Sequence, residues 1–136
     1  MAAAQKEAWF NLVIVLVVSI GVLALVPVLG PWRAQGWFGV LGLLGFGPFF
    51  FRKRAGIVVS DERDDQIRRR STVIAHVIFW LFFVAACVAA SVTFGPNGAV
   101  PVAWVQMSGW WGWVLVVGVG SVATLTQYGW GRSHEA

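Results

Sequence analysis

Charged residues are scarce in this sequence. Only 12% of its 136 residues are Asp, Glu, Lys or Arg, whereas 58% are hydrophobic. Soluble domains carry about 25% charged residues, and a soluble fold with so few charges would expose large apolar patches. The composition therefore excludes an ordinary soluble domain and favours a protein that is solvated by the lipid bilayer.

Cysteine and histidine are also scarce. The chain has one cysteine, Cys87, and two histidines, His76 and His134. A disulfide framework needs pairs of cysteines, and zinc or haem sites need several ligands of these types close together. We therefore expect no disulfide, no metal and no cofactor.

The sequence contains four long apolar runs. They cover about residues 8–30, 34–51, 71–94 and 108–130, and none contains Asp, Glu, Lys or Arg. An α-helix needs about 20 such residues to cross about 30 Å of hydrocarbon, and the first run is too long for a signal peptide. The pattern predicts an all-α integral membrane protein, a single domain of four transmembrane helices packed as a bundle, with an external loop at 95–107.

Basic residues gather between the second and third runs, in the charged segment 52–70. Seven of the ten Lys and Arg residues lie there, one lies between the first two runs, and none lies between the last two. Lys and Arg are enriched in cytoplasmic loops. We therefore expect a multi-pass protein of the inner (plasma) membrane with this segment and both termini in the cytoplasm. The positive charge is then a topology signal, and no direct nucleic-acid binding is expected.

The charged segment ends in an ordered pattern, with acids first and bases next, before the third apolar run. Acidic residues favour the first turn of a helix, and the spacing of Asp64 to Arg68 and of Asp65 to Arg69 allows ion pairs on a helix surface. No residue between 61 and 94 breaks a helix. We predict one helix of about 50 Å, at 1.5 Å per residue, that extends the third span into the cytoplasm.

Two kinds of ligand suit this segment. Basic side chains at headgroup depth bind anionic lipids with about 1 kcal/mol each. The candidate lipid-headgroup residues are Arg52, Lys53, Arg54, Arg68, Arg69 and Arg70. Crowded carboxylates at the helix start favour a basic counterpart on a soluble cytoplasmic partner or a neighbouring subunit. The candidate partner-binding residues are Asp61, Glu62, Arg63, Asp64 and Asp65. A segment that only caps the helix and sets the topology is the alternative, and a calcium site lacks the glycine-shaped loop.

Two short motifs carry a resemblance to a known family. The stretch DERDDQIRRR at 61–70 and the ending TQYGWG at 126–131 resemble a family of small predicted four-helix membrane proteins of unknown function. Members are often encoded beside small helix-turn-helix regulators, so the resemblance implies a regulatory role at the membrane. It implies no catalytic residues.

Polar residues inside the spans form a second candidate site. Asn11, His76, Gln127 and Tyr128 lie at comparable depth near the inner ends of their runs. Interhelical hydrogen bonds of this kind are worth about 0.6 to 2 kcal/mol each. An imidazole also titrates near neutral pH, which leaves open that His76 carries a proton or a ligand.

Small and aromatic residues indicate how the helices pack. Glycine recurs every three residues from Gly36 to Gly45, which favours close helix approach within the chain or between copies, and we expect a homo-oligomer. Six of the nine tryptophans fall at the outer ends of spans, where an interfacial belt or an aromatic cage for a cationic or sugar ligand fits them. They are Trp32, Trp37, Trp104, Trp110, Trp111 and Trp113.

Three classes of function remain. A small membrane-embedded regulatory or interaction protein, which engages a partner or anionic lipid through its charged helix start, accounts best for the charge pattern. The alternative is a subunit of an oligomeric transporter or pore, although every span lacks the carboxylate that proton-coupled export usually needs. An enzyme is not expected, because neither Cys87 nor Ser121 has an evident base at its own depth.

Overall fold

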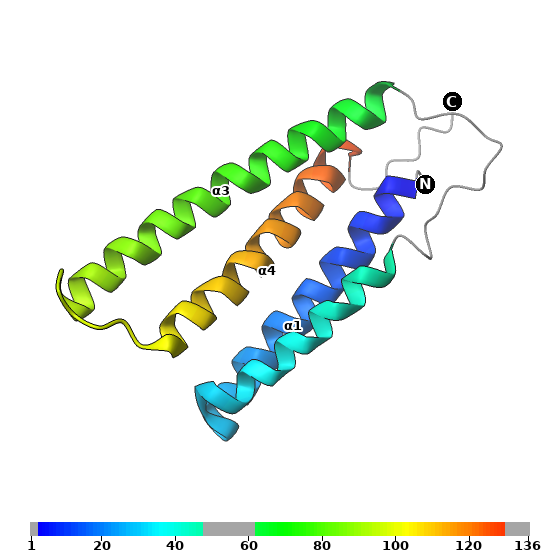
Figure 1. The fold of residues 1–136 in the computed structure, drawn as a ribbon. Coiled ribbons are helices and arrows are strands. Elements are labelled where there is room, and N and C mark those ends of the chain that lie inside the picture. The colour runs from blue at the N-terminus through cyan, green and yellow to red at the C-terminus, as the bar shows by residue number, and fades with distance from the viewer. Residues whose placement is uncertain (1–2, 48–61, 130–136) are drawn as a thin grey trace.

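The computed structural model describes residues 3–47 and 62–129, and all regular structure in these two ranges is helical (Figure 1). The elements are α1 (Ala3–Ala34), the 3-10 helix η1 (Gln35–Phe46), α3 (Glu62–Phe94) and α4 (Val102–Gln127). Three stretches are long and apolar enough to cross a membrane: Ala4–Phe46, Glu62–Phe94 and Val102–Gln127. The all-helical prediction is confirmed for the described residues.

The first of these stretches contains a reversal of the chain. Gly30 has φ 79° and ψ 162°, a conformation that glycine tolerates, and Pro31 follows with its fixed φ at the start of the returning segment. Trp37 Nε1 then donates a hydrogen bond to the Val17 carbonyl at 3.3 Å, and Gly47 lies beside the ring of Phe10. α1 and η1 are therefore antiparallel neighbours (Figure 1). Because they form one continuous apolar stretch, four separate spans remain a prediction.

The 3-10 form of η1 follows from a sequence period of three. A 3-10 helix has about three residues per turn, so residues spaced by three share a face, whereas in an α-helix they drift by about 60° per step. Gln35, Phe38 and Leu41 are buried on one face. Glycines occupy another face, where an added Cβ would meet nothing within 4 Å. They are Gly36, Gly39, Gly42 and Gly45.

The helices lie in an open row rather than a closed bundle. η1 packs on α1, α1 packs on α4, and α4 packs on α3, which leaves η1 and α3 at opposite edges (Figure 1). The core lies where α1, η1 and α4 meet, around Val18, Val22, Phe38 and Val114. The small residues of α4 permit this arrangement, because they let α1 and α3 approach it from two sides.

α3 is one unbroken helix of 33 residues, which confirms the predicted length of about 50 Å. Its buried residues are only Ile67, Ser71 and Ala75. Val73, Leu81 and Val88 are each more than half exposed on other faces. A helix that is apolar on all sides suits a lipid environment.

The connection between α3 and α4 is short, because α4 begins soon after Gly95. The sequence predicts an external loop at 95–107, and the first six residues of α4, which begins at Val102, fall within that range. Pro101, with φ −60°, precedes the helix, and its carbonyl accepts bonds from the backbone N–H groups of Trp104 and Val105. The fixed φ of proline favours a helix start, and it moves the boundary six residues towards the N-terminus.

Candidate functional site

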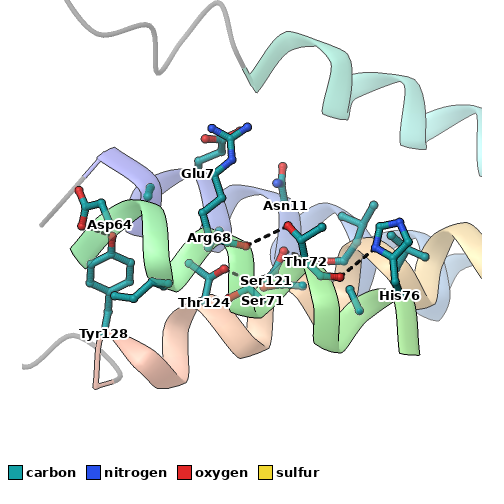
Figure 2. A pocket seen from close by; sticks show the side chains of 17 residues that line it. Glu7, Asn11, Asp64, Arg68, Ser71, Thr72, His76, Ser121, Thr124 and Tyr128 are labelled. Atoms are coloured by element: carbon teal, nitrogen blue, oxygen red, sulfur yellow. Dashed lines mark hydrogen bonds between the residues drawn. The ribbon is translucent and has the colours of Figure 1, made fainter. Parts of the chain in front are cut away.

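A polar groove lies between α1 and α3, with α4 as its floor, near the start of α1 and α3 and the end of α4 (Figure 2). Its volume is about 290 Å³. The polar side chains that line it are Glu7 and Asn11 from α1, Asp64, Arg68, Ser71, Thr72 and His76 from α3, and Ser121, Thr124 and Tyr128 from α4. In Figure 2, Asp64 and Tyr128 mark one end of this polar groove and His76 the other.

Small residues of α4 form the floor of the polar groove. A Cβ added to Gly120 would lie 3.7 Å from the Cβ of Ala75 on α3, and one added to Gly118 would lie 3.3 Å from Cγ1 of Val15 on α1. Glycine at these positions lets both neighbouring helices come close to α4, as small residues do in membrane helix pairs. The polar groove is the space between α1 and α3 above these two glycines of α4.

Hydroxyl groups in the polar groove bond to their own helices. Thr72 Oγ1 donates to the Arg68 carbonyl at 2.9 Å, Ser121 Oγ to the Val117 carbonyl at 2.7 Å, and Thr124 Oγ1 to the Gly120 carbonyl at 2.8 Å. This pattern is common for Ser and Thr inside helices. It uses the single hydroxyl proton and leaves oxygen lone pairs available.

The structure brings together three of the four residues predicted as an intramembrane polar cluster. Asn11, His76 and Tyr128 line the polar groove. His76 Nδ1 lies 2.9 Å from the Thr72 carbonyl, and the Tyr128 hydroxyl donates to Asp64 Oδ1. Gln127 lines a different groove, on another face of α4. It still contacts the polar groove indirectly, because its Nε2 donates to Ser71 Oγ at 2.9 Å as well as to the Ala123 carbonyl at 3.0 Å.

The charged start of α3 divides between the surface and the polar groove. Glu62, Arg63 and Asp65 are exposed, whereas Asp64 is half-buried against Tyr128. Asp61, the fifth predicted partner-binding residue, lies outside the described residues.

The predicted ion pairs of the α3 start are not formed. Within the described part of α3, no ion pair joins Asp64 to Arg68 or Asp65 to Arg69, so this prediction was wrong. The Asp64 carboxylate turns to the phenol of α4, and exposed pairs of this kind add only about 0.3–0.5 kcal/mol.

A second groove lies between α3 and α4. It is open, has a volume of about 520 Å³, and is lined by Arg69, Arg70, Val73, Ile74, Ala123, Thr126 and Gln127. We call it the arginine groove. Arg68 instead lines the polar groove, and the other three predicted headgroup residues, Arg52, Lys53 and Arg54, lie outside the described residues.

Several of the tryptophans that the sequence assigns to an interfacial belt pack against neighbouring aromatic rings. Phe38 stacks on Trp110 with ring centroids 5.5 Å apart, and it meets Trp111 edge-on at 5.8 Å. Trp104 meets Phe94 edge-on at 5.8 Å. These contacts join η1 to α4 and α3 to α4 at the end of the row where α4 begins.

Five residues of the site were not predicted from the sequence: Glu7, Ser71, Thr72, Ser121 and Thr124. Helical spacing could have found them, because Ser121, Thr124 and Tyr128 recur at i, i+3 and i+7 on one face of α4. On α3, Asp64, Arg68 and Thr72 are spaced by four residues and therefore also share one face. The sequence does not show that these faces of α3 and α4 meet, because that depends on how the helices pack.

Comparison with known proteins gives one match. No curated protein and no solved structure matches the chain. The model of the family described as "Predicted membrane protein (DUF2178)" matches residues 5–128, a range that runs from the first turns of α1 to Tyr128. The chain therefore belongs to this family of predicted membrane proteins, whose function is unknown.

Proposed function

We propose that this chain is a small membrane-embedded interaction protein that binds anionic lipid and a cytoplasmic partner through the charged start of α3, without catalysis. The arginine groove carries this proposal. It combines two adjacent guanidinium groups, Arg69 and Arg70, with an apolar surface formed by Val73, Ile74 and Ala123. An anionic phospholipid could place its phosphate at the two arginines and its acyl chains along the apolar surface.

The chemistry of the arginine groove fits a lipid phosphate. A guanidinium forms paired hydrogen bonds with phosphate oxygens, and basic residues near an anionic leaflet gain about 1 kcal/mol each. The hydroxyl of Thr126 and the amide of Gln127 line the same groove and add polar groups at its edge. The lipid would then hold the start of α3 at headgroup depth.

The topology that we propose has four crossings, with both termini and the α3 start in the cytoplasm. The reversal at Gly30 supports two crossings within the first apolar stretch. In the 3-10 form, the 12 residues of η1 extend about 24 Å, against about 18 Å as an α-helix. The short second segment thereby approaches the hydrocarbon thickness of about 30 Å. The basic residues of α3 support the cytoplasmic side.

The exposed residues Glu62, Arg63 and Asp65 are the part of the α3 start that we assign to a partner. Side chains at this end of α3 project beyond the apolar span, which starts at Ser71. A soluble protein with a basic patch, or a second copy of this chain, has the complementary charge. Asp64 is not assigned to the partner, because it accepts the hydrogen bond from Tyr128 and holds the start of α3 against α4.

Lipid binding is tested with the double variant Arg69→Gln/Arg70→Gln. The purified protein is mixed with phosphatidylglycerol or phosphatidylcholine of equal chain length, and bound lipid is counted by native mass spectrometry. We expect the wild type to prefer the anionic lipid and the variant to lose about tenfold or more of that preference, from two charges of about 1 kcal/mol each.

The matched control for lipid binding is Arg33→Gln. Arg33 is an exposed arginine in the last turn of α1, away from the arginine groove. It should retain the wild-type preference. Equal binding of the two lipids by the wild type would refute lipid recognition at this groove.

Partner binding is tested by crosslinking in native membranes from a photoreactive residue at Gln66, which is exposed on α3, with Gly98 in the outer connection as the control position. We expect capture of a soluble protein from Gln66 alone, and loss of capture when Glu62 and Asp65 are changed to Gln and Asn. Capture that persists in this double variant would contradict recognition by the acidic residues.

A subunit of an oligomeric transporter or pore is the second candidate. The observation that favours it is the polar groove, which continues from Tyr128 to His76 into the apolar part of α3. In proteoliposomes, His76→Ala and Asn11→Ala would then alter the flux of a small solute or ion. Absence of any flux in the wild-type protein excludes this function.

A further inference from the structure

The polar groove differs from the arginine groove in its balance of donors and acceptors. Three hydroxyl groups, those of Thr72, Ser121 and Thr124, already donate to carbonyls of their own helices. A hydroxyl has one proton and two acceptor lone pairs. These three groups therefore offer acceptors to a ligand and no donors.

His76 adds a further acceptor. Its Nδ1 lies 2.9 Å from the Thr72 carbonyl oxygen, which can only accept, so Nδ1 carries the proton of the neutral ring. Nε2 is then the acceptor nitrogen. Asn11 lines the same groove from α1 and offers an amide oxygen as an acceptor beside its two N–H donors (Figure 2).

Carboxylates give the polar groove its charge. Two carboxylates line it, Glu7 from α1 and Asp64 from α3. The groove has one basic side chain, Arg68, so its formal charge is negative. Asp64 Oδ1 accepts the Tyr128 hydroxyl, and its other oxygen keeps its lone pairs. The acids come from separate helices and are brought together by the packing on α4.

The depth of the polar groove suits a lipid headgroup. Its α3 side extends from Asp64 in the charged start to His76 in the apolar span. This range crosses the boundary at Ser71, where charged residues give way to apolar ones. A volume of about 290 Å³ is near the lower limit of about 300 Å³ for small-molecule sites and admits a small polar group.

From these observations we propose that the polar groove binds a primary ammonium group. Such a group brings three N–H donors and a positive charge, which match the acceptors of Thr72, Ser121 and Thr124 and the net negative charge of two carboxylates beside one arginine. A quaternary ammonium has no N–H and cannot satisfy them. In the described ranges, no group of three or more His, Cys, Asp and Glu side chains could hold a metal ion, so a metal ion fits less well.

An aminophospholipid and a soluble amine are the two sources of this group. The ethanolamine headgroup pairs an ammonium with a phosphate, and Arg68 on the rim of the polar groove offers the partner for that phosphate. A soluble diamine offers the ammonium alone. The arginine groove uses another face of the same turns of α3, so the two proposals are tested with different side chains.

The experiment compares phosphatidylethanolamine with phosphatidylcholine of the same chains, bound to the full-length protein and counted by native mass spectrometry. Titration calorimetry with ethanolamine and putrescine forms the second arm. We expect about a tenfold preference for the primary amine over its trimethyl counterpart, the factor of one charge-assisted hydrogen bond.

Two variants remove charge and keep shape: Glu7→Gln and Asp64→Asn. The asparagine can still accept the Tyr128 hydroxyl, so the contact between α3 and α4 is preserved. Each should lower amine binding about tenfold. Glu62→Gln is the matched control, because Glu62 is an exposed acid of the same helix outside the polar groove, and it should bind as the wild type does.

The two arms separate the sources of the amine. Preference for the ethanolamine lipid that is lost in either groove variant supports an aminophospholipid. Heat of binding from a soluble amine that is lost in either variant, without a lipid preference, supports a free amine. Absence of any preference for a primary amine, or binding unchanged in both groove variants, would overturn the proposal.

Discussion

At the scale of single residues, Gly21 makes room for the indole of Trp37. A Cβ at position 21 would lie 2.5 Å from Trp37 Cε2 and closer still to Nε1. The same indole donates to the Val17 carbonyl at 3.3 Å, which joins η1 to α1. The glycine therefore determines where the returning segment can pack.

We predict that Gly21→Ala displaces the Trp37 ring and destabilises the protein by about 1–3 kcal/mol, the usual range for overpacking. The free energy of unfolding is measured by titration with sodium dodecyl sulfate in mixed micelles. Gly39→Ala is the control, because a Cβ there meets nothing within 4 Å, and it should unfold as the wild type does. Equal stability of the two variants would contradict the close contact.

Gln35 is the other residue with an informative environment. It is buried at the start of η1, and among the described residues its Nε2 has no hydrogen-bond partner. A buried donor without a partner costs about 1–3 kcal/mol.

Replacing Gln35 with the apolar and similarly shaped Met should therefore raise the free energy of unfolding by about 1 kcal/mol or more. The same detergent titration measures it. Gln106→Met, at an exposed position of α4, is the control and should change stability little. A loss of stability in Gln35→Met would show that the amide has a partner.

At the scale of elements, the period of three in η1 distinguishes a 3-10 helix from an α-helix. The four glycines from Gly36 to Gly45 share one open face in the structure. As an α-helix, the first and last of them would point in opposite directions, about 180° apart at 100° per residue.

Spin labels on single cysteines at these four glycines, in a Cys87→Ser background, should show equal collision rates with oxygen dissolved in the lipid. An α-helical η1 would give rates that change steadily from Gly36 to Gly45, and that pattern would contradict the 3-10 form.

The helices differ in how much of their structure the sequence predicts. The unbroken α3 follows from a long stretch without Gly or Pro, which is a local property, and its length was predicted. α4 begins at Val102, six residues before the apolar run that starts at about 108, because an apolar run does not mark a helix start and Pro101 does. The reversal lies at Gly30, the last residue of the first apolar run, and the 3-10 form of η1 was not predicted although the glycine period of this segment is visible in the sequence.

At the scale of the whole molecule, the open row leaves α3 in contact mainly with α4. Both broad faces of the row carry apolar side chains, which the acyl chains of lipids can cover. The row also creates the polar groove, because α1 and α3 both pack on α4 and both line the groove.

The order of helices in the row is tested with pairs of cysteines in the Cys87→Ser background. Ala75→Cys with Gly120→Cys should form a disulfide on mild oxidation, because the Cβ separation of 3.7 Å lies within the usual range of about 3.5–4.5 Å. Ala75→Cys with Gly45→Cys should remain reduced within one chain, since η1 lies at the opposite edge. Gel mobility without reductant separates the two results, and an intramolecular bond in the second pair would indicate a closed bundle.

By itself, the sequence determined that this protein is helical, that its helices suit a bilayer, and that α3 is long and starts with acids. These are local consequences of apolar run length and of the charges that flank it. Only the tertiary structure decided that the helices form a row, that Asp64 meets Tyr128 across 64 residues, and that Gln127 separates from His76. The reason is physical: these contacts depend on which helices become neighbours, and that choice follows from the fit of small and large side chains between helices rather than from any single run.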